Sequence, residues 1–222
     1  MIRFKDRIEA GKLLAEKLSN YSNRSDVVIL ALPRGGVPVA FEIAKALNAL
    51  LDVFLVRKLG VPGQEELAMG AIATGGEIVL NNDIVKLLCI PDKTISFVVS
   101  EEQKELDWRE NFYRGTQPLP EIKDKVVILV DDGIATGSTM LVAIKAIKQY
   151  KPARIIVAVP VAPPSVCEQF RAEVDEFVCL ITPELFSAVG LWYLAFPQVT
   201  HDDVRNFLEK AKHKELSLEK SK

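Results

Sequence analysis

Two adjacent carboxylates, Asp131 and Asp132, stand between an apolar run and a loop of small and hydroxyl-bearing residues in the segment VVILVDDGIATGSTM. The small residues leave the backbone N–H groups of the loop open to an anion, and the helix predicted to begin near Ser138 adds the positive end of its dipole. A phosphate group therefore fits this loop, with hydroxyl groups as further donors. The residues expected around the phosphate are Ala135, Thr136, Gly137, Ser138 and Thr139.

The two carboxylates limit what the phosphate can belong to. They would repel it unless they face other groups, such as sugar hydroxyls or a metal ion. The combination suits a ribose 5-phosphate, with its hydroxyls on the acids and its phosphate in the loop. The alternative is an ordinary strand–loop–helix turn with a capping Ser or Thr, and the acid pair with three hydroxyls favours the functional interpretation. Neither a Walker A motif nor a dinucleotide-binding glycine motif occurs in the chain.

A second acidic pair, Asp202 and Asp203, is predicted to be structural. The pair follows Thr200 in the segment THDDVRNFL. Thr200 can cap a helix there while Asp203 returns a bond at the third helical position, which is the pattern of a capping box. His201 belongs to the same helix start.

Five apolar runs rich in β-branched residues are typical of strands buried on both faces. These runs cover residues 27–32, 52–57, 126–131, 154–161 and 176–181. Helical patterns alternate with them, after a first helix predicted at 3–20; they cover 37–49, 138–150 and 164–173. Strands that alternate with helices imply parallel pairing and right-handed crossovers. The chain is therefore predicted to be an α/β protein with an open twisted parallel sheet flanked by helices.

Three segments interrupt this alternation. Residues 60–91 mix Gly, Pro and acidic residues with short strand-like pieces, which predicts a mobile loop followed by a small hairpin that turns at 74–77. Residues 93–114 are long and strongly charged, as expected of a helix lying across the outside of the sheet. The tail that follows the last strand carries an aromatic cluster, formed by Phe186, Trp192, Tyr193 and Phe196.

The segment VVILVDDGIATGSTM resembles the phosphoribosyl diphosphate (PRPP) binding motif of type I phosphoribosyltransferases, and the chain supports the resemblance from about Phe4 to Phe207. The resemblance implies a five-stranded parallel core, a flexible loop after the second strand and a small hood that binds the acceptor. It also implies Mg²⁺ with PRPP, and a homodimer. On this pattern the chain is a single domain, 1–222, with its core at about 24–181, its hood at about 1–20 and 182–213, and its flexible loop at about 60–70.

The resemblance also assigns the diphosphate of PRPP to two segments. In LPRGGVP, at the end of the first strand, Arg34, Gly35 and Gly36 match the loop whose backbone N–H groups bind the leaving group, with a guanidinium as a charged fork. In VRKLGVPG, Arg57 and Lys58 resemble the basic residues beside the diphosphate. The loop that follows would close over the reaction centre and exclude water from a reaction whose unwanted outcome is PRPP hydrolysis.

The remaining PRPP contacts fall on the motif itself. Asp131 and Asp132 match the acids that bind the ribose hydroxyls, and they would approach the metal through those hydroxyls or through water. The 5′-phosphate would lie on Ala135–Thr139. The catalytic residues implied by the resemblance are Asp131, Asp132, Lys58 and Arg34.

The predicted activity is therefore transfer of the 5-phosphoribosyl group from PRPP to a nitrogenous acceptor, a nucleobase, with release of diphosphate. Acceptor contacts are expected at Phe186, by stacking, and near Ile181. In the alternative, the tail aromatics form only the small core of the hood. Ala135 stands where members acting on 6-oxopurines usually carry an Asp near N7 of the base, so hypoxanthine and guanine are expected to be poor acceptors.

Two other classes of protein fit the sequence less well. A non-catalytic regulator of the same fold, sensing PRPP or a nucleotide, is the main alternative to an enzyme. A hydrolase with a catalytic triad is weakly supported, because the chain lacks a G-x-S-x-G motif and carries only two histidines.

The amino-acid composition limits which partners and which location we expect for the chain. The chain has 28 Lys and Arg against 30 Asp and Glu, a formal charge of −2, which argues against non-specific nucleic-acid binding. The three cysteines form no C-x-x-C pair, so neither a disulfide framework nor a zinc cluster is expected. The first residues lack the apolar block of a signal peptide and no apolar run is long enough to span a membrane. These features predict a cytoplasmic protein without membrane contact.

Overall fold

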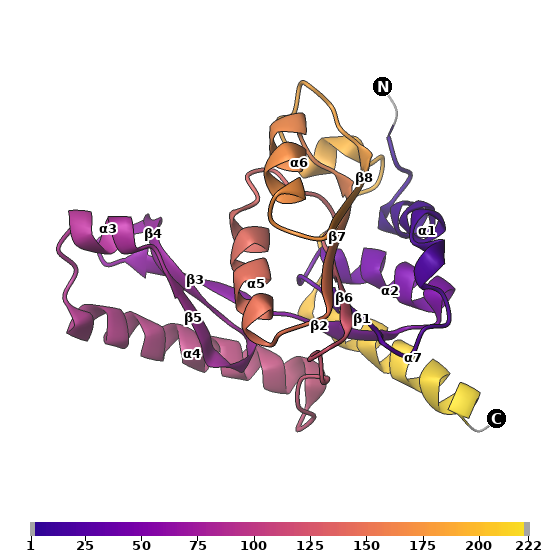
Figure 1. Ribbon diagram of the computed structural model, residues 1–222, viewed down its shortest axis with the longest axis horizontal. Helices are drawn as coiled ribbons and strands as arrows, with labels where there is room; N and C mark the ends of the chain where they lie inside the picture. Colours follow the sequence, from indigo (N-terminus) through magenta and orange to yellow (C-terminus); the bar gives the residue numbers. More distant parts are fainter. Residues whose placement is uncertain (1–2, 220–222) are drawn as a thin grey trace.

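The computed structural model describes residues 3–219, and for 213–219 the backbone alone. Five strands form one parallel sheet in the order β2-β1-β6-β7-β8, as the alternation of strands and helices predicts (Figure 1). These strands are β1 (Val27–Ala31), β2 (Leu50–Val53), β6 (Val126–Val130), β7 (Arg154–Val161) and β8 (Glu176–Ile181). They read as continuous apolar runs because helices cover both faces of the sheet.

Helices form one layer on each face of the sheet (Figure 1). On one face lie α1 (Arg7–Lys17), α2 (Gly36–Leu47) and α7 (His201–Glu219), and on the other α5 (Ser138–Gln149) and α6 (Pro164–Arg171). Side chains of a strand alternate between the layers: Ile29 packs in the first and Leu30 in the second. The expected fold class, an open parallel α/β sheet flanked by helices, is confirmed.

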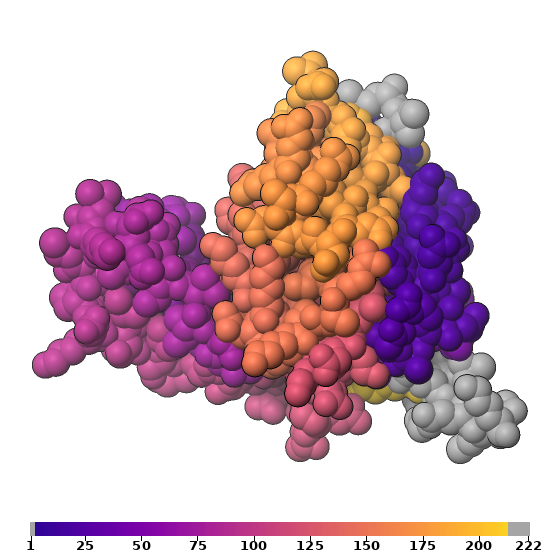
Figure 2. All heavy atoms as spheres, in the orientation of Figure 1, coloured from indigo at the N-terminus to yellow at the C-terminus, as the bar shows by residue number. Residues whose placement is uncertain are grey.

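A second sheet and two helices project from this core, and we call residues 56–114 the arm (Figures 1 and 2). Its sheet is antiparallel, in the order β3-β4-β5. Its elements are β3 (Val56–Val61), β4 (Gln64–Ala73), β5 (Glu77–Leu80), α3 (Asn82–Leu87) and α4 (Asp92–Arg114). A 3₁₀ turn at Thr74–Gly76 joins β4 to β5, which confirms the hairpin predicted there. Two further 3₁₀ turns lie at Ser19–Tyr21 and Val189–Trp192.

Three expectations about this region differ from the structure, two in residues 52–70 and one in the long helix that follows. The apolar run 52–57 is not one strand, because the chain leaves the parallel sheet after Val53 and enters the arm at Val56. The backbone of Leu55 pairs there with Thr74 of the arm. Residues 60–70, expected as a flexible loop, form the ends of β3 and β4 with irregular register at Gly60, and their mobility stays a prediction.

The long charged helix is also placed differently. It does not cross the outside of the parallel sheet: α4 packs on β3 and β4, and its last turn reaches α7 and β2. There the buried guanidinium of Arg114 bonds both carboxylate oxygens of Asp52 at 3.0 Å. This ion pair links the C-terminal end of α4, in the arm, to strand β2 of the core.

The first described residues and the tail, residues 182–200, are joined to each other. Backbone bonds run from Phe4 N to Trp192 O at 2.9 Å and from Leu194 N to Phe4 O at 2.8 Å. The rings of Phe4, Trp192 and Tyr193 form a small apolar cluster together with Ala10 of α1 and Val161 of β7. The first two residues of the expected hood range 1–20 lie outside the described part of the chain.

Helix α7 begins as the sequence predicts. The hydroxyl of Thr200 accepts from Asp203 N at 3.1 Å, and Thr200 N donates to the Asp203 carboxylate at 2.9 Å, so the capping box is confirmed. Nδ1 of His201 contacts the Tyr113 hydroxyl at 2.6 Å. All three cysteines are free thiols. Within residues 3–219, no helix combines the length and apolar character that crossing a bilayer requires.

Candidate functional site

The two carboxylates and the glycine loop meet at one edge of the parallel sheet. Asp131 and Asp132 follow β6, and the loop before α2 follows the neighbouring strand β1, so both lie at carboxyl ends of adjacent parallel strands. The contact is close: a Cβ atom on Gly35 would overlap Oδ2 of Asp132. The peptide bond from Pro33 to Arg34 in this loop is cis. The structure thus brings together the two segments that the sequence predicts to share a site.

The loop after the carboxylates is open to solvent. Ala135, Thr136, Ser138 and Thr139 are exposed, and no side chain caps the N-terminus of α5. Gly137 is the N-cap, with a φ of 79° that favours glycine, and a Cβ atom there would lie 2.6 Å from the ring of Phe170. First-turn N–H groups without a side-chain acceptor, beside exposed hydroxyls, can bind an anion.

Arg7, the first residue of α1, forms an ion pair with Asp132. Its Nε donates to Oδ2 of Asp132 at 2.8 Å, and its guanidinium also donates to the carbonyl oxygen of Pro197 at 2.8 Å. The Tyr193 hydroxyl donates to the backbone carbonyl of Asp132 at 2.6 Å. The sequence did not single out Arg7, because it lies in an ordinary charged amphipathic stretch, and Tyr193 was noted only as an aromatic of the tail.

Burial raises the pKa of both carboxyls of the pair. Burial raises the pKa of Asp131 well above its usual value, and the neighbouring Asp132 carboxylate raises it further. Burial also raises the pKa of Asp132, whereas Arg7 acts in the opposite direction. Asp131 accepts the backbone N–H of Asp132 at 2.8 Å. Carboxyls held in such a setting carry a high electrostatic cost, which is typical of functional sites.

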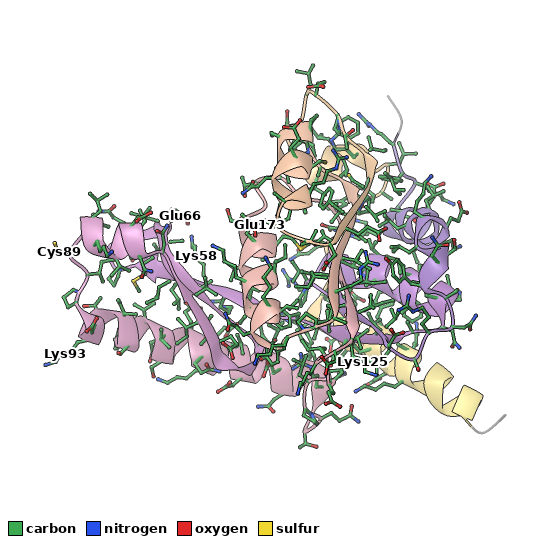
Figure 3. All side chains as sticks on the ribbon, viewed as in Figure 1. Lys58, Glu66, Cys89, Lys93, Lys125 and Glu173 are labelled. Atoms are coloured by element: carbon green, nitrogen blue, oxygen red, sulfur yellow. The ribbon has the colours of Figure 1, made fainter. Side chains whose placement is uncertain are left out.

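Arg57 and Lys58 do not lie beside the carboxylate pair. Both are on β3 of the arm, where Arg57 Nε pairs with Glu102 at 2.7 Å and Lys58 Nζ pairs with Glu66 at 3.2 Å. Figure 3 shows the Lys58 and Glu66 side chains on the arm. The structure gives neither basic residue a contact with the carboxylate pair.

A cavity of about 480 Å³ adjoins the pair. Its lining residues are Arg7, Arg34, Gly35, Asp132, Phe196, Pro197, Gln198 and Val199. The two acceptor contacts expected from the sequence do not line it. Phe186 stacks on Trp192 at 6.5 Å between ring centroids, and Ile181 pairs with Val161 in the sheet beside the same small cluster.

A parallel α/β sheet with an acid pair and an open loop at the end of one strand, beside a glycine loop at the end of the next, is the arrangement of the type I phosphoribosyltransferase fold. The chain belongs to this family, since residues 5–189 match the phosphoribosyl transferase domain. A Mycobacterium tuberculosis protein named "putative phosphoribosyl transferase" is 45% identical over 209 residues, which is 94% of this chain and 47% of that protein. This chain therefore spans about half the length of that relative.

Two further relatives bear on the fold and the class. The crystal structure of TT1426 from Thermus thermophilus is 42% identical and superposes with a TM-score of 0.83, covering 94% of this chain and 99% of that one. A uracil phosphoribosyltransferase of Mycoplasma genitalium is 41% identical over 71 residues, 30% of this chain and 34% of that protein.

Proposed function

We propose that this chain transfers the 5-phosphoribosyl group of PRPP to a nitrogen atom of a small acceptor. The observation that carries the proposal is the contact of the acid pair with the Gly35 loop, beside an uncapped helix N-terminus. Asp131 and Asp132 would bind the ribose hydroxyls and the loop Ala135–Thr139 the 5′-phosphate. One site then offers separate groups to each part of PRPP.

The diphosphate would lie on Arg34–Gly36. The Arg34 guanidinium lines the cavity and has no hydrogen bond or ion pair within the described residues, so it is available to an anion. Arg57 and Lys58 would join from the arm. Lys58 pairs with a fully exposed Glu66, and exposed ion pairs of this kind are weak enough to exchange partners.

The donor set fits a magnesium ion that arrives with the diphosphate. Among the side chains that the structure describes, in residues 3–212, no group of three or more His, Cys, Asp or Glu could form a metal cage, whereas Mg²⁺ needs only one or two carboxylates when phosphates and water supply the rest. Asp131 and Asp132 would hold it, through ribose hydroxyls or water. When bound, it would neutralise charge on the leaving diphosphate.

In the transfer, the bond from C1 of the ribose to the diphosphate oxygen breaks and a bond from C1 to the acceptor nitrogen forms. The electron pair of the broken bond leaves with the diphosphate, and the proton of the acceptor nitrogen passes to water. Positive charge builds at C1 in the transition state, where the carboxylates of Asp131 and Asp132 stabilise it. Arg34 and Lys58 stabilise the negative charge of the leaving group.

A nucleobase is the proposed acceptor, held on the side of the cavity formed by the tail. Phe196 and Gln198 line this side and offer an aromatic ring and an amide, whereas Phe186 and Ile181 pack in the small cluster. We therefore favour Phe196 and Gln198 as acceptor contacts. Ala135 supplies no carboxylate for N7 of a 6-oxopurine, so hypoxanthine and guanine remain expected to be poor acceptors.

The test combines calorimetry with an acceptor screen. The wild type should bind PRPP with Mg²⁺, and Asp131→Asn/Asp132→Asn should bind it at least about a hundredfold more weakly, because two ribose contacts are lost. Asp202→Asn/Asp203→Asn removes the same charge from a structural pair and should bind normally. Diphosphate release identifies the acceptor. PRPP binding without release for any base would instead indicate the non-catalytic regulator.

Two properties rest on resemblance and composition. We propose a homodimer, as the family implies, and a cytoplasmic location, as the free cysteine thiols suggest. Sedimentation at micromolar concentration tests the first, and a fluorescent fusion in the source cells tests the second.

A further inference from the structure

Arg7 connects three parts of the chain at the candidate site. From the start of α1 its guanidinium reaches Asp132 after β6 and the Pro197 carbonyl in the tail, each at 2.8 Å. The centre of the guanidinium lies 3.7 Å from the centroid of the Phe196 ring. The side chain is 9% exposed, so these contacts are made in a largely dehydrated setting.

The tail also contacts Asp132 directly, through Tyr193. Tyr193 donates to the backbone carbonyl of Asp132, and its ring packs on that of Phe196 with centroids 4.9 Å apart. Oδ2 of Asp132 is occupied by Arg7, whereas Oδ1 is bonded neither by Arg7 nor by Tyr193. The carboxylate is thereby oriented, with one oxygen fixed and the other outside these contacts.

We propose that Arg7 is a positioning residue that couples the tail to the ribose-binding carboxylate of Asp132. This role rests on the proposed function. With Oδ2 held by Arg7, Oδ1 faces the bound ribose, and the same guanidinium fixes the tail segment that lines the cavity. Occupation of the ribose site and ordering of the tail then favour each other, since coupling between two sites is reciprocal.

The geometry explains why arginine is suited to this position. The guanidinium donates to Asp132 from Nε and to Pro197 from Nη1 while its flat face packs on a ring. A lysine carries all its N–H donors on one nitrogen atom and has no planar face to stack. Arg7→Lys should therefore keep the charge beside Asp132 but lose the tie to Pro197. Arg7→Met should lose both.

A double-mutant cycle separates positioning from general stability. PRPP–Mg²⁺ affinity is measured by calorimetry for the wild type, Arg7→Met, Asp132→Asn and the double variant. Alone, Arg7→Met should weaken binding about tenfold, and in the Asp132→Asn background it should weaken binding less than about twofold, because its effect passes through Asp132. Arg24→Met, at an exposed ion pair with Asp26, is the matched control and should bind as the wild type does.

Hydrogen exchange in residues 192–199 provides the second measurement. PRPP–Mg²⁺ should slow exchange there in the wild type, and less so in Arg7→Lys, which keeps the fold if Arg7→Met does not. Equal losses from Arg7→Met in both backgrounds, or tail protection unchanged in Arg7→Lys, would overturn the role of Arg7 while leaving the proposed function intact. A wild type that does not bind PRPP would overturn both.

Discussion

The backbone of Gly35 and the carboxylate of Asp132 touch each other, and Oδ2 of Asp132 lies where any larger residue at position 35 would place its Cβ atom. The sequence predicts that this glycine admits a diphosphate to the backbone. The structure adds that it admits the protein's own carboxylate. The Gly35 loop and the carboxylate that we propose to bind ribose are therefore in van der Waals contact.

Gly35→Ala tests this contact. Asp132 cannot move aside freely because Arg7 holds its carboxylate, so the new methyl group should displace either the loop or the acid. We expect PRPP–Mg²⁺ affinity to fall at least about tenfold while the protein stays folded. Gly115→Ala at the end of α4 is the control: its φ of 67° makes alanine unfavourable, but nothing lies within 4 Å of its Cβ position. Normal affinity in Gly35→Ala would contradict the prediction.

Asp131→Asn should stabilise the free protein at neutral pH. The folded state holds the ionised Asp131 carboxyl at a cost, since burial and Asp132 raise its pKa, and asparagine can still accept the Asp132 N–H. We expect the melting temperature to rise by about 2–4 °C, the shift that about 1 kcal/mol produces in a domain of this size. The same variant should lose PRPP affinity.

The pH dependence of this stabilisation follows from the direction of the shift. Because the folded state has the higher pKa, it binds a proton more readily than the unfolded chain, and the stability of the wild type rises as the pH falls toward the usual carboxyl value of about 4. The difference between Asp131→Asn and the wild type should therefore be largest at neutral pH and shrink toward pH 4. Calorimetric melting from pH 4 to 8 measures it, and a difference that grows on acidification would show that the pKa is lowered instead.

The tip of the β3–β4 hairpin should be the part of the arm that responds to ligand. The pairing of β3 with β4 shifts register on both sides of Gly60, so amides between Val61 and Glu66 have few ladder bonds. We expect fast hydrogen exchange there in the free protein, slowed at least about fivefold by PRPP–Mg²⁺. Amides of the regular β4–β5 ladder serve as the internal reference. Equal exchange with and without ligand would exclude closure of this segment.

Phe186 and Phe196 should separate packing from recognition. Phe186 is half-buried against Trp192, so Phe186→Ala should lower the free energy of unfolding by about 2 kcal/mol with little effect on the acceptor KM. Phe196 lines the cavity with 38% of its surface exposed, so Phe196→Ala should raise the acceptor KM with a smaller loss of stability. Melting curves and initial rates with the acceptor from the screen distinguish them. The reverse pattern would restore Phe186 as the acceptor contact.

The sequence predicted the elements that depend on local pattern. Apolar runs located four of the five parallel strands, and the motif that ends β6 located the acid pair and the loop after it, because these features are contiguous in the chain. The chain's passage from one sheet to another at Phe54 left no local signal, since both sheets bury apolar residues. Arg7 was missed for a similar reason: its partners are remote in sequence, and an arginine in the first turn of an amphipathic helix looks like any solvated charge.

The bond from Arg7 to Pro197 joins residues 190 positions apart. During synthesis, the five parallel strands are complete once β8 has emerged at Ile181, but Tyr193 and Pro197 are then still to come. A nascent chain can therefore form the parallel sheet and the acid pair before Tyr193 and Pro197 are available. The bonds from Tyr193 to Asp132 and from Arg7 to Pro197 are then still missing. Competence for ligand would then be acquired only after the parallel sheet has already formed.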